Sequence, residues 1–356
     1  MAAWLSIRAI VCVAVISVAC THVAGGACKI ALVGELRVDT THNRVITEGE
    51  INGQSVKVLI DTGSQFTFVW EDAARRLNLP IQEMQGVRIY GVGGRSKSSR
   101  ALVKHLQAGK FYADDLNVVV LDRGAVHDSA STALVLGDDL FSHFDTEFDL
   151  AHGRIRLLRT EGCEPGQTPY WAKEYSMGEL EGWDVLQPQI RMRVLVNGKP
   201  ISAVFDTGAP TSIITRNAAE VAGVTPWLEA GKPDTKIGGT GSKMEDSWIG
   251  TFASFSVGDE SVKNVALRIS DMFKADREVQ TGSHIAAAPV GLPTMLVGCD
   301  FFLAHHMLVL STMKKMVFTY DGGPIFQATQ TNRPVHTDAE PAVTPQTPAA
   351  DANGHL

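Results

Sequence analysis

The chain has 356 residues, of which 44% are hydrophobic and 20% are charged, and its formal net charge is -7. This composition is typical of a soluble globular protein, and the length allows two domains of ordinary size. Acidic and basic residues are mixed along the chain without a basic stripe, which argues against a nucleic-acid partner.

The first segment, residues 1–27, resembles an export signal. Arg8 provides a weak positive start, residues 10–19 form an apolar run, and small residues at 24–27 offer a cleavage site. The apolar run is too short to cross a bilayer, which needs about 20 residues, so no membrane span is expected. We expect an exported protein, either periplasmic or secreted. A lipoprotein anchor at the loosely matching residues 17–20 and an ordinary buried strand are the lesser alternatives.

Three cysteines follow the predicted signal. Cys28 and Cys163 flank the first predicted domain, and an oxidising compartment would permit a disulfide between them. Cys299 lies in an apolar run and is expected to be a buried thiol. None of them has a CxxC spacing, and packed or solvated histidines are commoner than ligands at His305 and His306. We therefore expect neither a metal nor a cofactor.

The chain repeats itself at a separation of 145 residues. Each copy contains an Asn-Gly pair, at 52–53 and 197–198, and an Asp-Thr-Gly triplet, at 61–63 and 206–208. The Asn-Gly pair predicts a tight hairpin turn, because both residues accept a positive φ. The apolar run before each triplet predicts a buried strand that ends at the aspartate.

The two copies continue in step after the aspartate. Each contains a β-rich run, a helical start, a glycine-rich turn, an apolar strand ending in Gly, a short helix and a last strand. These segments are residues 66–70, 71–74, 91–94, 134–137, 138–143 and 154–158 in the first copy, and 211–215, 216–219, 238–241, 295–298, 300–305 and 315–320 in the second. The second copy is 16 residues longer between Asp and Gly, mostly within residues 270–294, where an extra surface loop is expected.

Short strands, frequent glycine turns and few long helices predict a mostly β fold with two domains. We place these domains at residues 29–160 and 184–325. Residues 161–183 would link them, and their aromatic side chains are expected to pack against a domain. Residues 327–356 are rich in Pro, Thr and Ala, which predicts a disordered tail.

The two triplets and their surroundings resemble the aspartic proteases, and the retropepsin-like branch more closely than pepsin. A single Asp-Thr-Gly is a weak signal, whereas two copies at matched points of a repeat are specific. The resemblance covers nearly all of residues 45–160 and 185–320. It implies two tandem retropepsin-like (acid protease) β-barrel domains with short helices, fused in one chain as a pepsin-like pseudo-dimer.

The resemblance also implies the residues of a site. Asp61 and Asp206 would be the catalytic pair, sharing one proton because two carboxylates in contact do not both ionise readily. The supporting residues would be Thr62, Gly63, Ser64, Thr207 and Gly208. In this scheme Ser64 could bond an outer carboxylate oxygen, whereas Ala209 could not.

By the same resemblance, the two glycine-rich turns would be flaps that close over a peptide, and a plain hairpin turn is the equal alternative. The flap residues would be Tyr90, Gly91, Gly93 and Gly94 in the first copy, and Gly238, Gly239 and Gly241 in the second. Gly137 and Gly298 are expected to serve packing near the pair.

The main hypothesis is an aspartic endopeptidase that acts on polypeptides as a monomer. A homodimer that pairs halves between chains is one alternative, and a peptide-binding protein without catalysis is the other.

Overall fold

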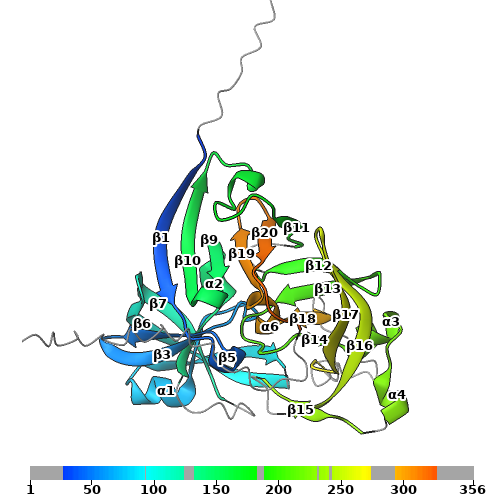
Figure 1. Cartoon of the computed structure of the whole chain (residues 1–356). Coiled ribbons are helices and arrows are strands. Elements are labelled where there is room, and N and C mark those ends of the chain that lie inside the picture. The colour runs from blue at the N-terminus through cyan, green and yellow to red at the C-terminus, as the bar shows by residue number, and fades with distance from the viewer. Residues whose placement is uncertain are drawn as a thin grey trace, which may run out of the picture.

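The computed structural model describes residues 27–92, 94–123, 132–182, 188–230, 232–239, 243–273 and 293–326. The predicted export signal (except residue 27), most of the predicted extra loop and the predicted tail lie outside these ranges. The described part is mostly β with short helices, as the sequence predicted (Figure 1). No helix in it is both long and apolar enough to cross a membrane.

The first half forms a barrel of six strands in the order β2-β3-β8-β4-β7-β6, which closes through pairing of β2 with β6. A seventh strand, β5, extends β6 outward as a long hairpin. The strands are β2 (Ile46–Ile51), β3 (Gln54–Ile60), β4 (Phe68–Trp70), β5 (Ile81–Gly91), β6 (Gly94–Ala108), β7 (Phe111–Leu121) and β8 (Thr132–Leu136). The helices of this half are η1 (Thr41–Asn43), α1 (Glu71–Arg76) and α2 (Asp138–Phe141).

The second half repeats this topology in the order β12-β13-β18-β14-β17-β16, closed by β12 and β16 and extended by β15. Its strands are β12 (Arg191–Val196), β13 (Lys199–Phe205), β14 (Ile213–Ile214), β15 (Thr235–Ile237), β16 (Glu245–Val257), β17 (Glu260–Ser270) and β18 (Met295–Val297). Its helices are α3 (Arg216–Val221), α4 (Pro226–Ala230) and α6 (Cys299–Phe302). The repeat seen in the sequence is therefore a repeat of whole barrels.

The predicted Asn-Gly turns are present in both barrels. Asn52 and Gly53 have φ values of 51° and 77°, and Asn197 and Gly198 have 50° and 73°. Positive φ at two successive residues matches the right-handed twist of the flanking strands, which is why Asn-Gly connects β2 to β3 and β12 to β13.

A third sheet joins the two halves in the order β1-β10-β9-β19-β20-β11. Its strands are β1 (Lys29–Arg37), β9 (Asp145–Asp149), β10 (Arg154–Glu161), β11 (Ser176–Glu179), β19 (His305–Leu310) and β20 (Lys315–Tyr320), with η2 (Leu150–His152) and η3 (Pro165–Gln167) beside them. The central pair combines β9 of the first half with β19 of the second. Strand β11 lies within the predicted linker and pairs with β20.

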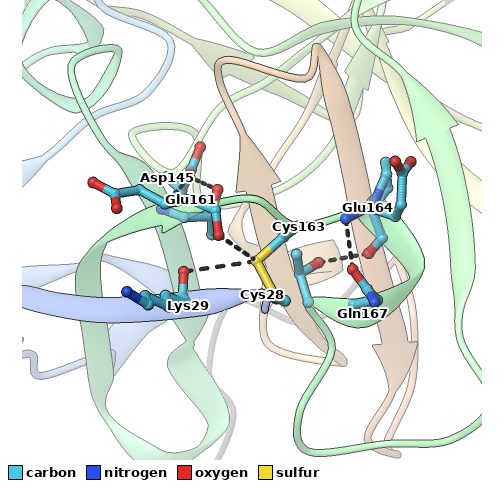
Figure 2. Close-up of a disulfide and its surroundings, with 10 residues drawn as sticks. Cys28, Lys29, Asp145, Glu161, Cys163, Glu164 and Gln167 are labelled. Carbon is cyan, nitrogen blue, oxygen red and sulfur yellow. Dashed lines mark hydrogen bonds between the residues drawn. A yellow bond between two sulfur atoms is a disulfide. The ribbon is translucent and has the colours of Figure 1, made fainter. Parts of the chain in front are cut away.

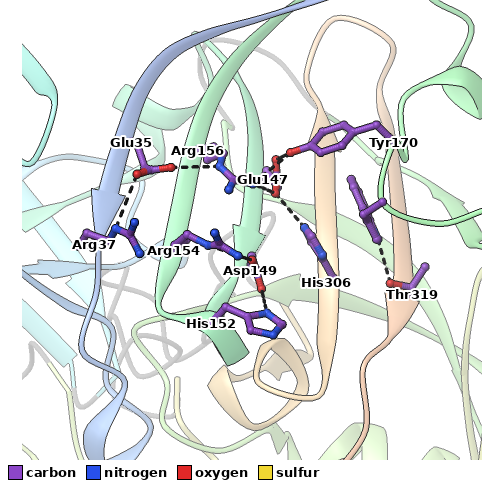
Figure 3. A network of polar contacts seen from close by, with 11 residues as sticks. Glu35, Arg37, Glu147, Asp149, His152, Arg154, Arg156, Tyr170, His306 and Thr319 are labelled. Carbon is purple, nitrogen blue, oxygen red and sulfur yellow. Dashed lines mark hydrogen bonds and ion pairs between the residues drawn. The ribbon is translucent and has the colours of Figure 1, made fainter. Parts of the chain in front are cut away.

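Polar side chains are concentrated on the junction between β9 and β19 (Figure 3). The buried Glu147 accepts hydrogen bonds from Arg156 at 2.6 Å and from the Tyr170 hydroxyl, and it contacts His306 Nε2 at 2.9 Å. Trp171, in the segment predicted to pack against a domain, stacks on the His306 ring at 4.0 Å. The histidine is therefore packed in a polar network that ties both halves together.

A disulfide links Cys28 to Cys163 (Figure 2). The two residues adjoin β1 and β10, which are neighbours in the third sheet, so the bond joins the edge strand to the strand beside it. Cys299 is a free buried cysteine, as the sequence predicted.

Candidate active site

The two aspartates stand at equivalent strand ends. Asp61 follows β3, and its N–H donates to Leu136 O in β8 at 2.9 Å. Asp206 follows β13, and its N–H donates to Val297 O in β18 at 2.8 Å. Both neighbouring strands, β8 and β18, are buried and mostly apolar. The hydrogen bonds to them fix the position of each aspartate at the end of its own strand.

The two Asp-Thr-Gly turns are braced against each other by their threonines. The N–H of Thr62 donates to Thr207 Oγ1 at 3.1 Å, and the N–H of Thr207 donates to Thr62 Oγ1 at 3.0 Å. Each hydroxyl then donates across the interface, Thr62 to Phe205 O at 2.7 Å and Thr207 to Ile60 O at 2.9 Å. Both side chains are fully buried, so these four bonds lock the turns in register.

In the first turn, Asp61 Oδ1 accepts the N–H groups of Gly63 and Ser64, each at 3.0 Å. The Ser64 hydroxyl does not reach the carboxylate. It donates to Phe66 O at 2.8 Å, so the expectation that it would bond an outer carboxylate oxygen is wrong. The physical reason is that its single proton is already used by a carbonyl of the following loop.

The second turn holds its aspartate in the same way. Asp206 Oδ1 accepts the N–H of Gly208 at 2.8 Å and that of Ala209 at 3.1 Å. Since neither turn uses a hydroxyl on its carboxylate, the Ser-to-Ala difference does not make the two aspartates unequal.

Each aspartate lies directly against the opposite turn. A β-carbon at Gly63 would stand 2.2 Å from Asp206 Cγ, and one at Gly208 would stand 2.3 Å from Asp61 Cγ. No side chain fits at either position, which explains the glycine of both triplets. The two carboxyl groups therefore lie close together, and the interaction between them affects both pKa values.

The surroundings raise the pKa values of both carboxyls. Burial raises the pKa of Asp61, whereas the hydrogen bond from Asp206, backbone N–H groups and the charge of Arg44 oppose that rise. Burial raises the pKa of Asp206 well above its ordinary value, and the adjacent Asp61 charge and hydrogen bond raise it further. Both directions favour one proton held between the two carboxyls.

Gly137 and Gly298 support the turns through close packing. A β-carbon at Gly137 would stand 2.6 Å from the carbonyl carbon of Phe66, and one at Gly298 would stand 2.6 Å from that of Thr211. Both lie outside the left-handed region, so close approach of the backbone explains these glycines.

The first glycine-rich turn is the tip of the β5–β6 hairpin, where Gly91 pairs with Gly94. Gly93 and the side chain of Tyr90 lie outside the described residues. The second turn lies between β15 and β16 and includes Gly238 and Gly239.

The two turns meet at their tips. A β-carbon at Gly239 would stand 2.7 Å from Val92 Cβ, and Val92 packs against an apolar cluster that contains Ala209. Gly241 lies outside the described residues. The hairpin tips therefore meet beside the second Asp-Thr-Gly turn, and their binding of substrate stays a prediction.

Sequence reasoning missed two pairs of residues around the aspartates. Arg44 and Gln189 occupy equivalent places, and Gln189 Nε2 donates to Gly63 O at 2.5 Å. Asp138 and Cys299 form the other pair, each directly after the closing glycine. The repeat offset of 145 residues would have aligned Arg44 with Gln189. Alignment of Gly137 with Gly298 would have aligned Asp138 with Cys299.

The family model for aspartyl proteases matches residues 47–140 and 192–301. The chain belongs to this family. Each matched region contains one Asp-Thr-Gly turn and the barrel that carries it. No curated protein matches the chain.

Proposed function

We propose that this aspartyl protease family member is an aspartic endopeptidase that hydrolyses peptide bonds with water activated between Asp61 and Asp206. One observation carries the proposal. The carboxyls of two different barrels of the same chain each lie against the Asp-Thr-Gly turn of the other barrel and interact with each other. Two acids in this arrangement hold one proton between them, which provides a base and an acid in one site.

The shared proton gives the pair two roles, a charged base and a neutral acid. The charged carboxyl is the base, and it takes a proton from a water molecule as the water oxygen attacks the peptide carbonyl carbon. The neutral carboxyl is the acid, and its O–H donates a hydrogen bond to the carbonyl oxygen as charge develops there. When the tetrahedral intermediate collapses, the C–N bond breaks and the leaving nitrogen takes a proton from the pair.

The substrate in this proposal is a polypeptide. The hairpin tips that meet at Val92 and Gly239 would have to separate to admit it and would then donate backbone hydrogen bonds to it. Their glycines suit this role because they place backbone groups close to a bound chain.

The structure favours the single-chain site over pairing between chains, because both aspartates of one chain are already in contact. A peptide-binding protein without catalysis is the second candidate. The intact pair of turns counts against it, since binding alone requires no shared proton.

The test replaces each aspartate with asparagine, which keeps the shape but cannot act as base or acid. Asp61→Asn and Asp206→Asn should each reduce kcat for an unfolded protein or a peptide library by on the order of 10³-fold. Asp114→Asn, at a carboxyl that is 75% exposed on the β6–β7 hairpin, is the matched control and should keep full activity. Retained hydrolysis in either dyad variant would exclude the shared-proton mechanism, and gel filtration with light scattering should show an active monomer.

Export is part of the same proposal. The disulfide between Cys28 and Cys163 supports it, because such bonds persist in oxidising compartments. Sequencing the N-terminus of protein recovered from outside the cytoplasm should find a start at or close to Cys28. A cytoplasmic chain that keeps Met1 would contradict export and leave the peptidase proposal standing.

A further inference from the structure

A third buried carboxyl, that of Asp138, lies close to the pair. Asp138 is the first residue of α2 and follows the strand end at Leu136 and Gly137. Its side chain has no exposed surface, and Cys299, the equivalent residue of the second half, is buried to the same degree. The mechanism above uses neither residue.

The carboxyl of Asp138 reaches across to the second half of the chain. Its Oδ2 accepts the N–H of Ile190 at 3.0 Å, while Oδ1 has no hydrogen-bond partner among the described residues. Ile190 immediately precedes β12, and its carbonyl accepts the N–H of Phe205 at 2.8 Å. Phe205 in turn immediately precedes Asp206. Two hydrogen bonds and one peptide bond therefore connect Asp138 to Asp206, at the end of β13 in the other barrel.

The charged groups around Asp138 are mostly acidic. Burial raises its pKa well above the ordinary value of 3.8, and the charges of Asp61, Asp139 and Asp206 raise it further. The N–H of Ile190 opposes this rise. A buried carboxylate with one hydrogen bond is costly, so the group takes up a proton instead.

Two cations also act in this region, Arg44 and Arg191. Arg44 lowers the pKa of Asp61 and that of Cys299, and the guanidinium of Arg191 contacts Gln189 Oε1 at 3.5 Å. Arg191 itself is partly buried, and its pKa is lowered for that reason.

We propose that Asp138 is a positioning residue for the catalytic pair: as an uncharged acid it accepts the Ile190 N–H and thereby aligns the β12–β13 hairpin that carries Asp206. The inference rests on the endopeptidase function proposed above. The neutral state matters, because a charged Asp138 would add a second negative charge beside the single charge of the pair and oppose it.

The first experiment compares kcat and KM for two substitutions. Asp138→Ala removes the acceptor of the Ile190 N–H, and we expect kcat to fall by on the order of 10²-fold with KM changed much less, because small displacements of a reacting group have effects of this size. Asp138→Asn keeps an oxygen acceptor without a charge and should retain kcat within about threefold. Cys299→Ala is the matched control at the equivalent position and should also keep kcat. An Asp138→Ala variant with the kcat of the wild type would overturn the proposal.

The second experiment tests the charge state without using activity. Urea unfolding is measured from pH 4 to pH 7 for chains with and without Asp138→Asn, both in the Asp61→Asn background to prevent self-cleavage. When the folded state raises the pKa of an acid, the protein loses stability as pH rises above the pKa that the acid has in the unfolded chain. A chain with asparagine at this position has no such loss. The unfolding constants should therefore diverge in favour of Asp138→Asn by about tenfold per pH unit, up to the folded pKa. A constant ratio across this range would show that Asp138 is not held neutral and would also overturn the proposal.

The two proposals fail differently. If the wild-type chain cleaves nothing, the endopeptidase function and the positioning role fail together, whatever the unfolding data show. If the wild type is active and either Asp138 result is negative, only the positioning role fails.

Discussion

Replacing Thr207 with valine tests the bracing between the two turns. The substitution keeps the shape of the side chain but removes the hydroxyl that accepts the Thr62 N–H at 3.1 Å and donates to Ile60 O at 2.9 Å. Both partners are then left buried without this bond, at about 1–3 kcal/mol each. The free energy of unfolding should therefore fall by about 2–6 kcal/mol, a large part of the 5–15 kcal/mol typical of a folded domain.

Activity should fall as well, because the same bonds set the separation of the aspartates. A displacement of about 1 Å lowers kcat by on the order of 10²-fold. Urea unfolding followed by tryptophan fluorescence measures the stability, and hydrolysis of a peptide substrate measures kcat.

Thr207→Ser is the matched control. It keeps the hydroxyl and removes one methyl group, so we expect a loss of about 1 kcal/mol and nearly full activity. If Thr207→Val costs no more stability than Thr207→Ser, the reasoning from the crossed hydrogen bonds is refuted.

Three further predictions concern packing, acid and the disulfide. Gly208→Ala should abolish activity, because its β-carbon would stand 2.3 Å from Asp61 Cγ, whereas Gly34→Ala, with no contact below 3.6 Å, should not; a hydrolysis assay on both variants decides. Hydrogen bonds from His306 and Tyr170 lower the pKa of Glu147 below 4.5 despite its burial, so the stability it contributes is present above pH 4.5 and lost as pH falls through the lowered value. Urea unfolding of Glu147→Gln should therefore vary less with pH below 4.5 than that of the parent chain. Cys163→Ser should lower the free energy of unfolding by about 2–4 kcal/mol, and reduction of the parent chain by dithiothreitol should cause an equal loss.

Local features of the site could be predicted because short segments encode them. The Asn-Gly turns follow from the positive φ that both residues accept, and the structure has them at both predicted places. The buried strands before Asp61 and Asp206 follow from their apolar runs. Because the same order of features occurs twice, the repeat also predicted two similar domains, and the structure shows two barrels of the same topology.

The assignment of Ser64 shows where local reasoning fails. The Asp-Thr-Gly triplet placed Ser64 next to Asp61, but the direction of the Ser64 hydroxyl depends on which acceptor lies nearer. In the folded chain that acceptor is Phe66 O. A rotatable side chain with several possible partners has no signature in the sequence.

The amino-acid sequence by itself determined the turns, the strands that end at the two aspartates, and the duplication that makes them equivalent. Only the tertiary structure decided that β9 pairs with β19, that the charge of Arg44 and the amide of Gln189 both act on the first Asp-Thr-Gly turn, and that Asp138 reaches Ile190. The physical reason is how far apart in the sequence the interacting groups lie. A turn depends on the dihedral preferences of adjacent residues. These contacts join groups that lie 17 residues apart for Arg44 and Asp61 and more than 50 apart for the others, and the packing of the folded chain sets their meeting.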